Sequence, residues 1–249
     1  MASPLLLELA GTALTQLLCF WLPSSVYLAT PRLFPAFARR HKTQPSQAEP
    51  TASELQHCAK VVLQNQLLGL SLQTLVHVVH STLLGAAPYA AGPQPSPLGL
   101  VRDIALCIPL CECLFYGMHS LLHRPALYRR IHKIHHSFTA PVALAAQYAH
   151  PLEHVLTCFV PIMVPPLLVR ASVWSMWTFV GTVGFESATL HSGFKVGLLA
   201  ERHDRHHEVG VRGGYGTFAF LDWVFGTEMR SVEAAGKGRT EGDETGYRD

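Results

Sequence analysis

Histidine is the residue type whose number and spacing stand out in this 249-residue chain. Eleven of the 15 histidines fall between residues 119 and 207. Nine of these form an H-x-x-x-H pair, two H-x-x-H-H triplets and a single histidine before the last triplet: His119, His123, His132, His135, His136, His191, His203, His206 and His207. Imidazole is the commonest metal ligand in proteins, and two histidines four residues apart share one face of a helix. One such pair is weak evidence, but three clusters in a charge-poor chain predict a metal site.

The composition of the histidine clusters indicates which metals they would bind. Within each H-x-x-H-H, the middle histidine points about 100° away from the last, so a triplet reaches two ions or wraps around one. The set holds no thiolate and exceeds what one ion can use, unlike a structural zinc site. Imidazole suits zinc, copper, iron and nickel alike. A centre that needs two redox-capable ions at a membrane face points to iron and oxygen chemistry, although the spacing itself does not select iron.

The rest of the composition predicts a membrane protein. Hydrophobic residues make up 49% of the chain and charged residues 14%, against about 25% charged residues in an average protein. This excludes a disordered chain, a coiled coil or an ordinary soluble domain, and the net charge of +2 leaves no footprint for nucleic acid. A membrane span needs about 20 apolar residues. Five runs are candidates, of which the last two either cross fully or form a shallower hairpin: 5–30, 61–84, 98–122, 152–169 and 172–190.

The loops between these runs predict an orientation. Residues 31–60 and 124–133 are rich in Lys and Arg, whereas residues 85–97 carry no charge. Basic loops stay in the cytosol, so all the histidine clusters are expected at the cytosolic face. The second run contains amide and imidazole side chains, so one of its faces should be buried in a bundle. The predicted fold is all-α: a polytopic membrane helical bundle of about four to five membrane helices, with a histidine-rich, two-metal cap on the cytosolic side. The cysteines form no C-x-x-C pair and are interpreted as small buried hydrophobic residues.

The histidine motifs resemble those of the membrane di-iron fatty acid hydroxylase/sterol desaturase superfamily. Shorter elements are similar to those of its C-4 methylsterol oxidases: Gln147-Tyr-Ala-His-Pro-Leu-Glu153 resembles E-Y-A-H-P-x-E, and Glu186 with Leu190-His-Ser-Gly193 resembles E…H-S-G. Residues 215–216 and 221–227 resemble the stretch that closes the domain. The sequence departs from the usual residues at four positions that leave every box histidine in place: Ser120, Gln147, Ser187 and Gly214.

The resemblance implies roles for individual residues. It makes the nine clustered histidines the metal ligands of two iron ions that use O₂. A ligating imidazole usually donates its other N–H to a carboxylate or carbonyl. The candidates to support the ligands in this way are Glu112, His150, Glu153, Glu186, Asp204 and Asp222. The resemblance also divides the chain into N-terminal membrane helices and a linker (1–97), a fatty acid hydroxylase-like catalytic domain (98–230) and a flexible polar tail (231–249).

The function expected from these features is oxidation of a lipid C–H or methyl group, most of all in a sterol. Because no dinucleotide or haem-attachment motif is present, electrons would come from a separate cytochrome b5-type carrier with its reductase, at the endoplasmic reticulum membrane. One alternative is a fatty acid or sphingolipid hydroxylase or desaturase. Another is a non-catalytic scaffold that holds zinc. A metal transporter is disfavoured because it needs histidines on both sides of the membrane.

Overall fold

The computed structural model describes residues 3–47, 49–210 and 213–229, and this part of the chain is helical without a β-strand. The predicted tail at 231–249 lies outside the described residues. The elements follow in this order: α1 (Pro4–Gln16), the π-helical turn η1 (Leu17–Trp21), α2 (Leu22–Leu33), α3 (Pro35–His41), α4 (Ala52–Leu84), α5 (Pro97–Leu122), α6 (Pro125–Arg130), η2 (His132–Ser137), η3 (Ala143–Gln147), α7 (Pro151–Glu153), the π-helical turn η4 (His154–Phe159), α8 (Val160–Leu168), α9 (Val173–Leu190), α10 (Leu198–Val209) and α11 (Phe220–Phe225).

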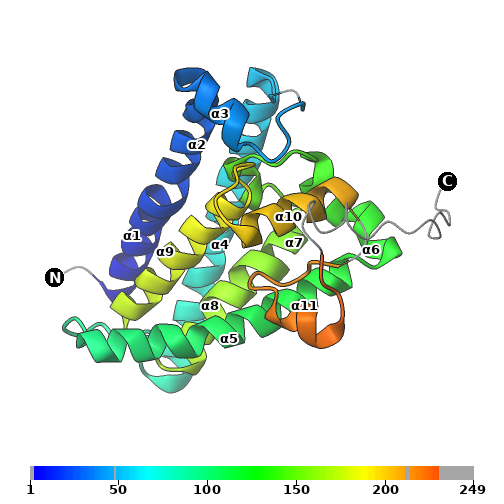
Figure 1. Ribbon diagram of the computed structural model, residues 1–249. Coiled ribbons are helices and arrows are strands. Elements are labelled where there is room, and N and C mark those ends of the chain that lie inside the picture. The colour runs from blue at the N-terminus through cyan, green and yellow to red at the C-terminus, as the bar shows by residue number, and fades with distance from the viewer. Residues whose placement is uncertain (1–2, 48, 211–212, 230–249) are drawn as a thin grey trace.

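Three helical segments of the described chain are long and apolar enough to cross a membrane: Pro4–Leu33, Ala52–Leu84 and Pro151–Leu168. They match the first, second and fourth predicted runs. The third and fifth runs form α5 and α9, which are not among these three. In Figure 1, α5 lies across the base of the molecule at a steep angle to α1. Its Asp103 is buried and accepts a hydrogen bond from Ser175 of α9 at 2.7 Å, so this carboxylate is paired inside the protein.

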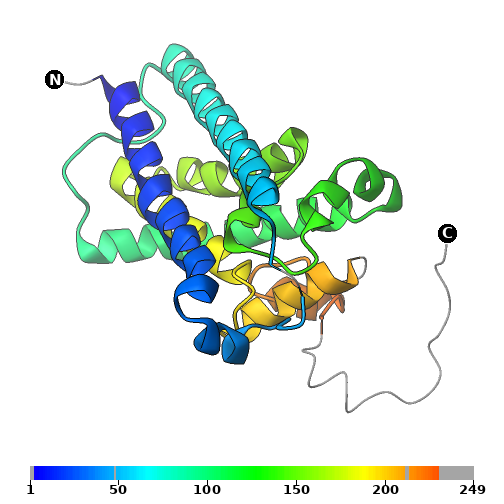
Figure 2. The ribbon, with the colours of Figure 1, turned by 90° about the horizontal axis from the view of Figure 1, so that it is seen from above.

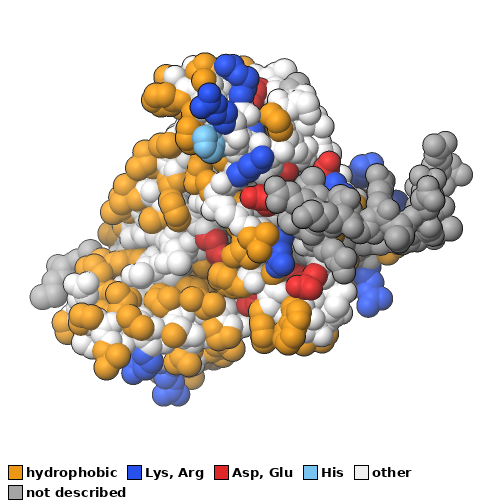
Figure 3. Space-filling view, viewed as in Figure 1, with side chains coloured by type: hydrophobic (Ala, Val, Ile, Leu, Met, Phe, Trp, Pro, Cys, Tyr) orange, Lys and Arg blue, Asp and Glu red, His pale blue; other side chains and the backbone are white. Residues whose placement is uncertain are grey.

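The outer surface of the long helices is apolar. Leu14 of α1, Leu67 and Leu83 of α4 are 55%, 54% and 75% exposed. Figure 3 shows hydrophobic side chains over the flank formed by α1 and α2 and along α5, while Lys and Arg gather at the end that carries α3 and again below α5. An apolar surface of this extent is typical of a protein that contacts lipid. The predicted membrane bundle is therefore confirmed at the level of its helical, lipid-facing architecture.

The polar face of α4 is buried, as its sequence predicts. Asn65, Gln66, Gln73 and His77 are all buried. The side chain of Asn65 donates to the backbone carbonyls of Gln147 and Ala149, which ties α4 to η3. His77 pairs with the buried Glu8 of α1 at 3.0 Å. These contacts join the first two membrane helices to the segment that leads into the histidine clusters, and Figure 2 shows α1 and α4 flanking the shorter helices behind them.

Gly11 sets how closely α1 approaches α9. A Cβ atom at Gly11 would overlap the indole ring of Trp177, whose Nε1 donates to the carbonyl of Glu8 at 3.3 Å. Small residues allow this kind of close approach between membrane helices, where packing drives association. By contrast, a Cβ at Gly117, in the last third of α5, would meet nothing within 4 Å.

We expect the two glycines to respond in opposite ways to alanine. Gly11→Ala should lower the free energy of unfolding by about 1–3 kcal/mol, because the indole must move. Gly117→Ala should leave it unchanged or raise it by about 0.5–1 kcal/mol, because alanine is the better helix residue. Thermal unfolding of both variants in one detergent provides the measurement. Equal midpoints for the two variants would contradict the close packing of α1 on α9.

Candidate metal centre

The structure brings the nine clustered histidines into two compact groups. The ligand nitrogens within each group all lie within 4.8 Å of one another. The first, here called the five-histidine group, contains His119, His123, His132, His136 and His206. The second, here called the four-histidine group, contains His135, His191, His203 and His207. The two groups contain the nine histidines that the sequence predicted and no other residue. Their role as metal ligands stays a prediction.

Each H-x-x-H-H triplet is divided between the two groups. In η2, His132 and His136 enter the five-histidine group while His135 turns to the four-histidine group. In α10 the division is reversed: His203 and His207 enter the four-histidine group and His206 the five-histidine group. The sequence left open whether a triplet would reach two metals or wrap around one. The fold places every triplet across both groups.

The supporting hydrogen bonds determine which ring nitrogen faces inward. Backbone carbonyls lie 2.8–3.2 Å from Nδ1 of four histidines: Tyr215 for His119, Gly213 for His206, Ser187 for His191 and Tyr148 for His135. A carbonyl oxygen only accepts, so each of these rings carries its proton on Nδ1. Nε2 is then left with a lone pair that points into the group, as metal binding requires.

The inward-facing nitrogens fit a bound cation. Nε2 of His191 lies 3.3 Å from Nε2 of His135, and both rings are protonated on Nδ1, so two lone pairs face each other. Within the part of the chain that the structure describes, both ring nitrogens of His207 are buried without a hydrogen-bond partner. Buried polar atoms without a partner are costly. A metal ion in each group would satisfy the inward nitrogens and replace the repulsion with attraction.

Burial keeps these rings neutral. Desolvation is the largest cause that lowers the pKa of His135 and of His206, each to about 4. It also lowers the pKa of His203 and His207. A buried imidazole loses the water that would stabilise its charged form. At neutral pH the rings therefore offer lone pairs rather than protons.

Among the carboxylates predicted to support the ligands, Glu153 contacts one of them. Its Oε1 accepts a hydrogen bond from Nδ1 of His132 at 2.6 Å, and both side chains are buried. This carboxylate takes the place that backbone carbonyls take at four of the other rings. The interaction orients His132 and raises the basicity of its inward nitrogen.

Glu112 and Asp222 support the histidines indirectly, through the backbone of residues 215–217. Glu112 of α5 accepts from the backbone N–H of Thr217 at 3.0 Å. Asp222 of α11 accepts from the backbone N–H groups of Tyr215 and Gly216 at 2.9 Å. They therefore hold the segment whose carbonyls, at residues 213 and 215, orient His206 and His119. The sequence did not show the role of these carbonyls, because any residue type supplies the same atom.

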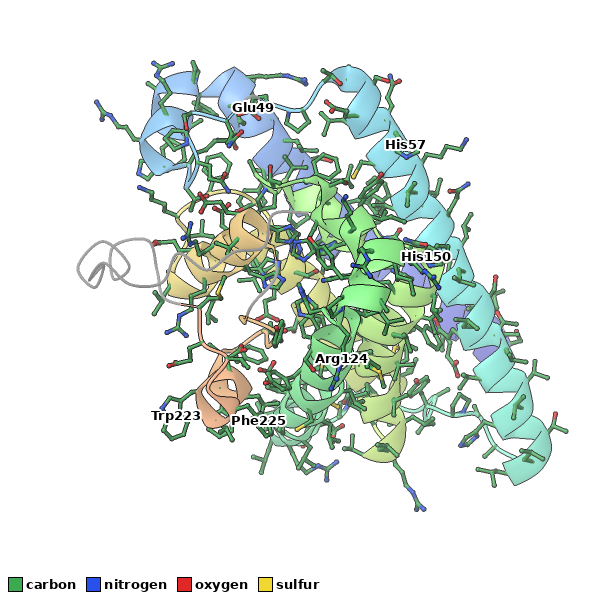
Figure 4. The ribbon with its side chains drawn as sticks, turned by 90° about the vertical axis from the view of Figure 1, so that its right-hand side faces the viewer. Glu49, His57, Arg124, His150, Trp223 and Phe225 are labelled. Carbon is green, nitrogen blue, oxygen red and sulfur yellow. The ribbon has the colours of Figure 1, made fainter. Side chains whose placement is uncertain are left out.

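The other predicted supporting residues make no hydrogen bond to the clustered histidines within the described chain. Asp204 accepts from the side chain of Gln44 at 2.9 Å, which attaches the N-terminal region to α10. His150 caps α7 through the N–H of Leu152 and lies beside α4, the helix that carries His57 (Figure 4). Glu186 lines the cavity described next.

An apolar cavity of about 80 Å³ adjoins both histidine groups. Imidazoles from each group form one wall, and the opposite walls come from α5, η4, α8 and α9, including Phe115, Ile162, Val183 and Leu190. In volume it is smaller than the roughly 150 Å³ cavity that holds benzene. It accommodates the end of a hydrocarbon group, placed directly against the inward-facing nitrogens.

Comparison with known proteins agrees with this geometry. The family model for fatty acid hydroxylase matches residues 104–227. The chain is 33% identical over 197 residues to fatty acid hydroxylase ahd1 of Mycosarcoma maydis, a match that covers 78% of this chain and 50% of that protein. It is 29% identical over 204 residues to a putative methylsterol monooxygenase of Dictyostelium discoideum, covering 78% and 74%. It is 28% identical over 207 residues to methylsterol monooxygenase 1 of Rattus norvegicus, covering 79% and 70%.

No solved structure matches the chain. The family model covers every one of the nine clustered histidines, and the curated relatives are hydroxylases and monooxygenases by name. The resemblance read from the histidine motifs is thereby confirmed. The chain belongs to the fatty acid hydroxylase/sterol desaturase superfamily, near the methylsterol oxidases.

Proposed function

We propose that this protein is a membrane-bound, non-haem di-iron oxygenase that hydroxylates or oxidises a C–H or methyl group of a lipid. The observation that carries the proposal is the pair of buried, all-imidazole groups beside one apolar cavity. One iron ion would be held by the five-histidine group and one by the four-histidine group. Two iron ions would supply O₂ activation and oxidising power, which no side chain provides.

The residues of the chain supply orientation and the exclusion of water. Backbone carbonyls and Glu153 hold the imidazoles with their Nε2 atoms inward. The apolar walls of the cavity exclude water and receive a hydrocarbon group. Which carbon of the lipid lies against the histidine groups decides between hydroxylation, stepwise oxidation of a methyl group and desaturation.

A sterol is the first substrate class that we propose. Its support is the similarity to methylsterol monooxygenases over most of their length. A fatty acyl or sphingolipid substrate is the second candidate, favoured by the similarity to a fatty acid hydroxylase. The third reading, a non-catalytic scaffold that holds zinc, makes a different prediction for the metal and is separated by the experiments below.

We also propose the surroundings in which the protein works. Residues 98–230 would form the catalytic domain, since all nine histidines lie within it. The basic residues Arg39 and Arg40 of α3, and Arg129 and Arg130 of α6, support a cytosolic position for the ends of the bundle that carry them. A cytochrome b5-type carrier and its reductase would then deliver electrons at the endoplasmic reticulum membrane.

Metal content tests the two groups separately. We expect purified protein to contain about two iron ions per chain, and His136→Ala and His203→Ala each to lose at least one, since each variant removes a ligand from one group. His41→Ala is the matched control, because His41 is exposed on α3 and its ring bonds the carbonyl of Phe37, which orients none of the clustered histidines. Elemental analysis after anaerobic iron loading measures the outcome. Wild-type content in both site variants would contradict metal binding at these histidines.

Substitution of Glu153 tests whether its contact with His132 strengthens metal binding. Glu153→Met keeps the length of the side chain but removes the acceptor for Nδ1 of His132. We expect iron affinity to fall about 10- to 100-fold. Glu186→Met is the control, because Glu186 lines the same cavity without contacting a histidine. Competition with a chelator gives the affinities, and equal values for the two variants would show that the contact at His132 has no effect on the metal.

Turnover tests the reaction. Iron-loaded, reduced protein in lipid nanodiscs should consume O₂ and oxidise a 4-methylsterol, with an oxygen atom from O₂ in a hydroxylated product. Mass spectrometry with ¹⁸O₂ detects it, and a free fatty acid and a ceramide presented in the same way distinguish the alternative substrates. Protein that binds zinc, rejects iron and consumes no O₂ would refute the oxygenase and support the scaffold.

A further inference from the structure

A second cavity lies deeper among the membrane helices and adjoins the one beside the histidine groups. Its walls come from α1, η1, α4, η4, α8 and α9, and its volume is about 50 Å³. The two cavities share three lining residues, Gln147, Cys158 and Ile162. A molecule that occupies both would therefore pass these three side chains.

The amide of Gln147 has a defined orientation at this junction. Nε1 of Trp21 donates to Oε1 of Gln66 at 2.8 Å, and Nε2 of Gln66 donates to Oε1 of Gln147 at 3.0 Å. An indole N–H only donates, so it determines which end of the Gln66 amide faces it. That amide in turn determines the orientation of the next. The NH₂ group of Gln147 is thus left to donate, at a residue that lines both cavities.

His154 brings a second unused polar group to the deeper cavity. His154 is only 5% exposed, and its Nδ1 has no hydrogen-bond partner within the described chain. It begins the π-helical turn η4, directly after Glu153, which contacts His132 on the other side. Such π-helical turns occur frequently at functional sites. Here the turn sends neighbouring side chains to different cavities.

Of the other polar side chains at the deeper cavity, Gln73 and Thr12 are paired with each other, and Thr15 and Gln16 of α1 are only half-buried. Gln73 donates to the hydroxyl of Thr12 at 3.2 Å, and that hydroxyl lies 4.0 Å from the sulfur of Met176. The buried side chains with unused hydrogen-bonding capacity are therefore Gln147 and His154. Polar groups within a membrane bundle are expensive without a partner, and their presence marks a functional site.

We infer that the deeper cavity binds an oxygen atom of the lipid, a hydroxyl or a carbonyl, through the amide of Gln147 and the imidazole of His154. The inference rests on the proposed function, because it places the same lipid across both cavities. The cavity beside the histidine groups receives the hydrocarbon group that is oxidised. The preferred substrate is then a lipid with an oxygen substituent within reach of the junction, rather than an unsubstituted hydrocarbon chain.

A matched pair of lipids tests the inference. We expect iron-loaded protein to bind cholesterol about tenfold more tightly than the corresponding sterane, which lacks only the hydroxyl and the double bond, because one hydrogen bond has roughly this value. The saturated 3-hydroxysterane is included to separate the two changes. Affinities come from the ligand-induced shift of thermal unfolding in nanodiscs. Equal affinities for the hydroxylated and unsubstituted steranes would overturn the inference.

Two variants, each with a control variant, separate recognition of the lipid oxygen from effects on folding. Gln147→Leu should lose most of the preference for the hydroxylated sterane, while Gln64→Leu on the exposed face of α4 should retain it. Trp21→Phe should weaken the preference without touching either cavity, because the Gln66 and Gln147 amides lose their defined orientation. Trp223→Phe, at an exposed residue of α11 (Figure 4), is its control. A preference that survives in Gln147→Leu would refute the role of the amide.

The binding ratio is measured without turnover, so it is independent of the proposed chemistry. Iron content and O₂ consumption of the same preparations report on the oxygenase. Protein that holds iron and consumes O₂ but binds both steranes equally retains the proposed function and loses the inference. Protein that prefers the hydroxylated sterane but neither holds iron nor consumes O₂ supports the binding site and refutes the oxygenase.

Discussion

The constraint on which the structure depends is the convergence of nine uncharged imidazoles in a buried space. Their inward nitrogens repel one another unless a cation lies between them, so the surrounding chain must hold each ring in place. Four of the nine rings are held by backbone carbonyls, at Tyr148, Ser187, Gly213 and Tyr215. These atoms accept hydrogen bonds but cannot donate them, so they determine the protonation of the rings as well as their direction. Precise backbone placement is therefore the main requirement of the site.

That requirement explains why polar contacts far from the histidines matter. Glu112 and Asp222 bind N–H groups of the segment that supplies two of the carbonyls. Asn65 binds the carbonyls at both ends of the segment around Tyr148, and Gln44 reaches Asp204 of α10. The N-terminal helices thus take part in shaping the centre as well as contacting lipid. A description of them as membrane anchors alone is incomplete.

The two cavities divide the recognition of a lipid into two tasks. The one beside the histidine groups is apolar and small, which suits a reacting hydrocarbon group that must be kept from water. The deeper one offers hydrogen-bonding groups within a membrane bundle. Glu153, at the end of α7, lines the first cavity and His154, at the start of η4, lines the second. Consecutive residues of a helix point about 100° apart, so adjacent side chains reach different cavities.

The sequence by itself determined the candidate site and the family: the nine histidines, their superfamily and the apolar runs follow from residue type and spacing, and all nine histidines do meet. It also indicated the buried face of α4 through its amide side chains. Tertiary structure alone decided how the triplets divide between two groups, that Glu153 rather than the other predicted carboxylates contacts a histidine, and that Trp21, Gln66 and Gln147 form a chain. These features depend on contacts between residues far apart in the sequence, such as Gln66 and Gln147, which are 81 positions apart, and on carbonyls that every residue carries. The spacing of residue types along the chain shows neither the long-range contacts nor the positions of the carbonyls. Both are set by the way the helices pack.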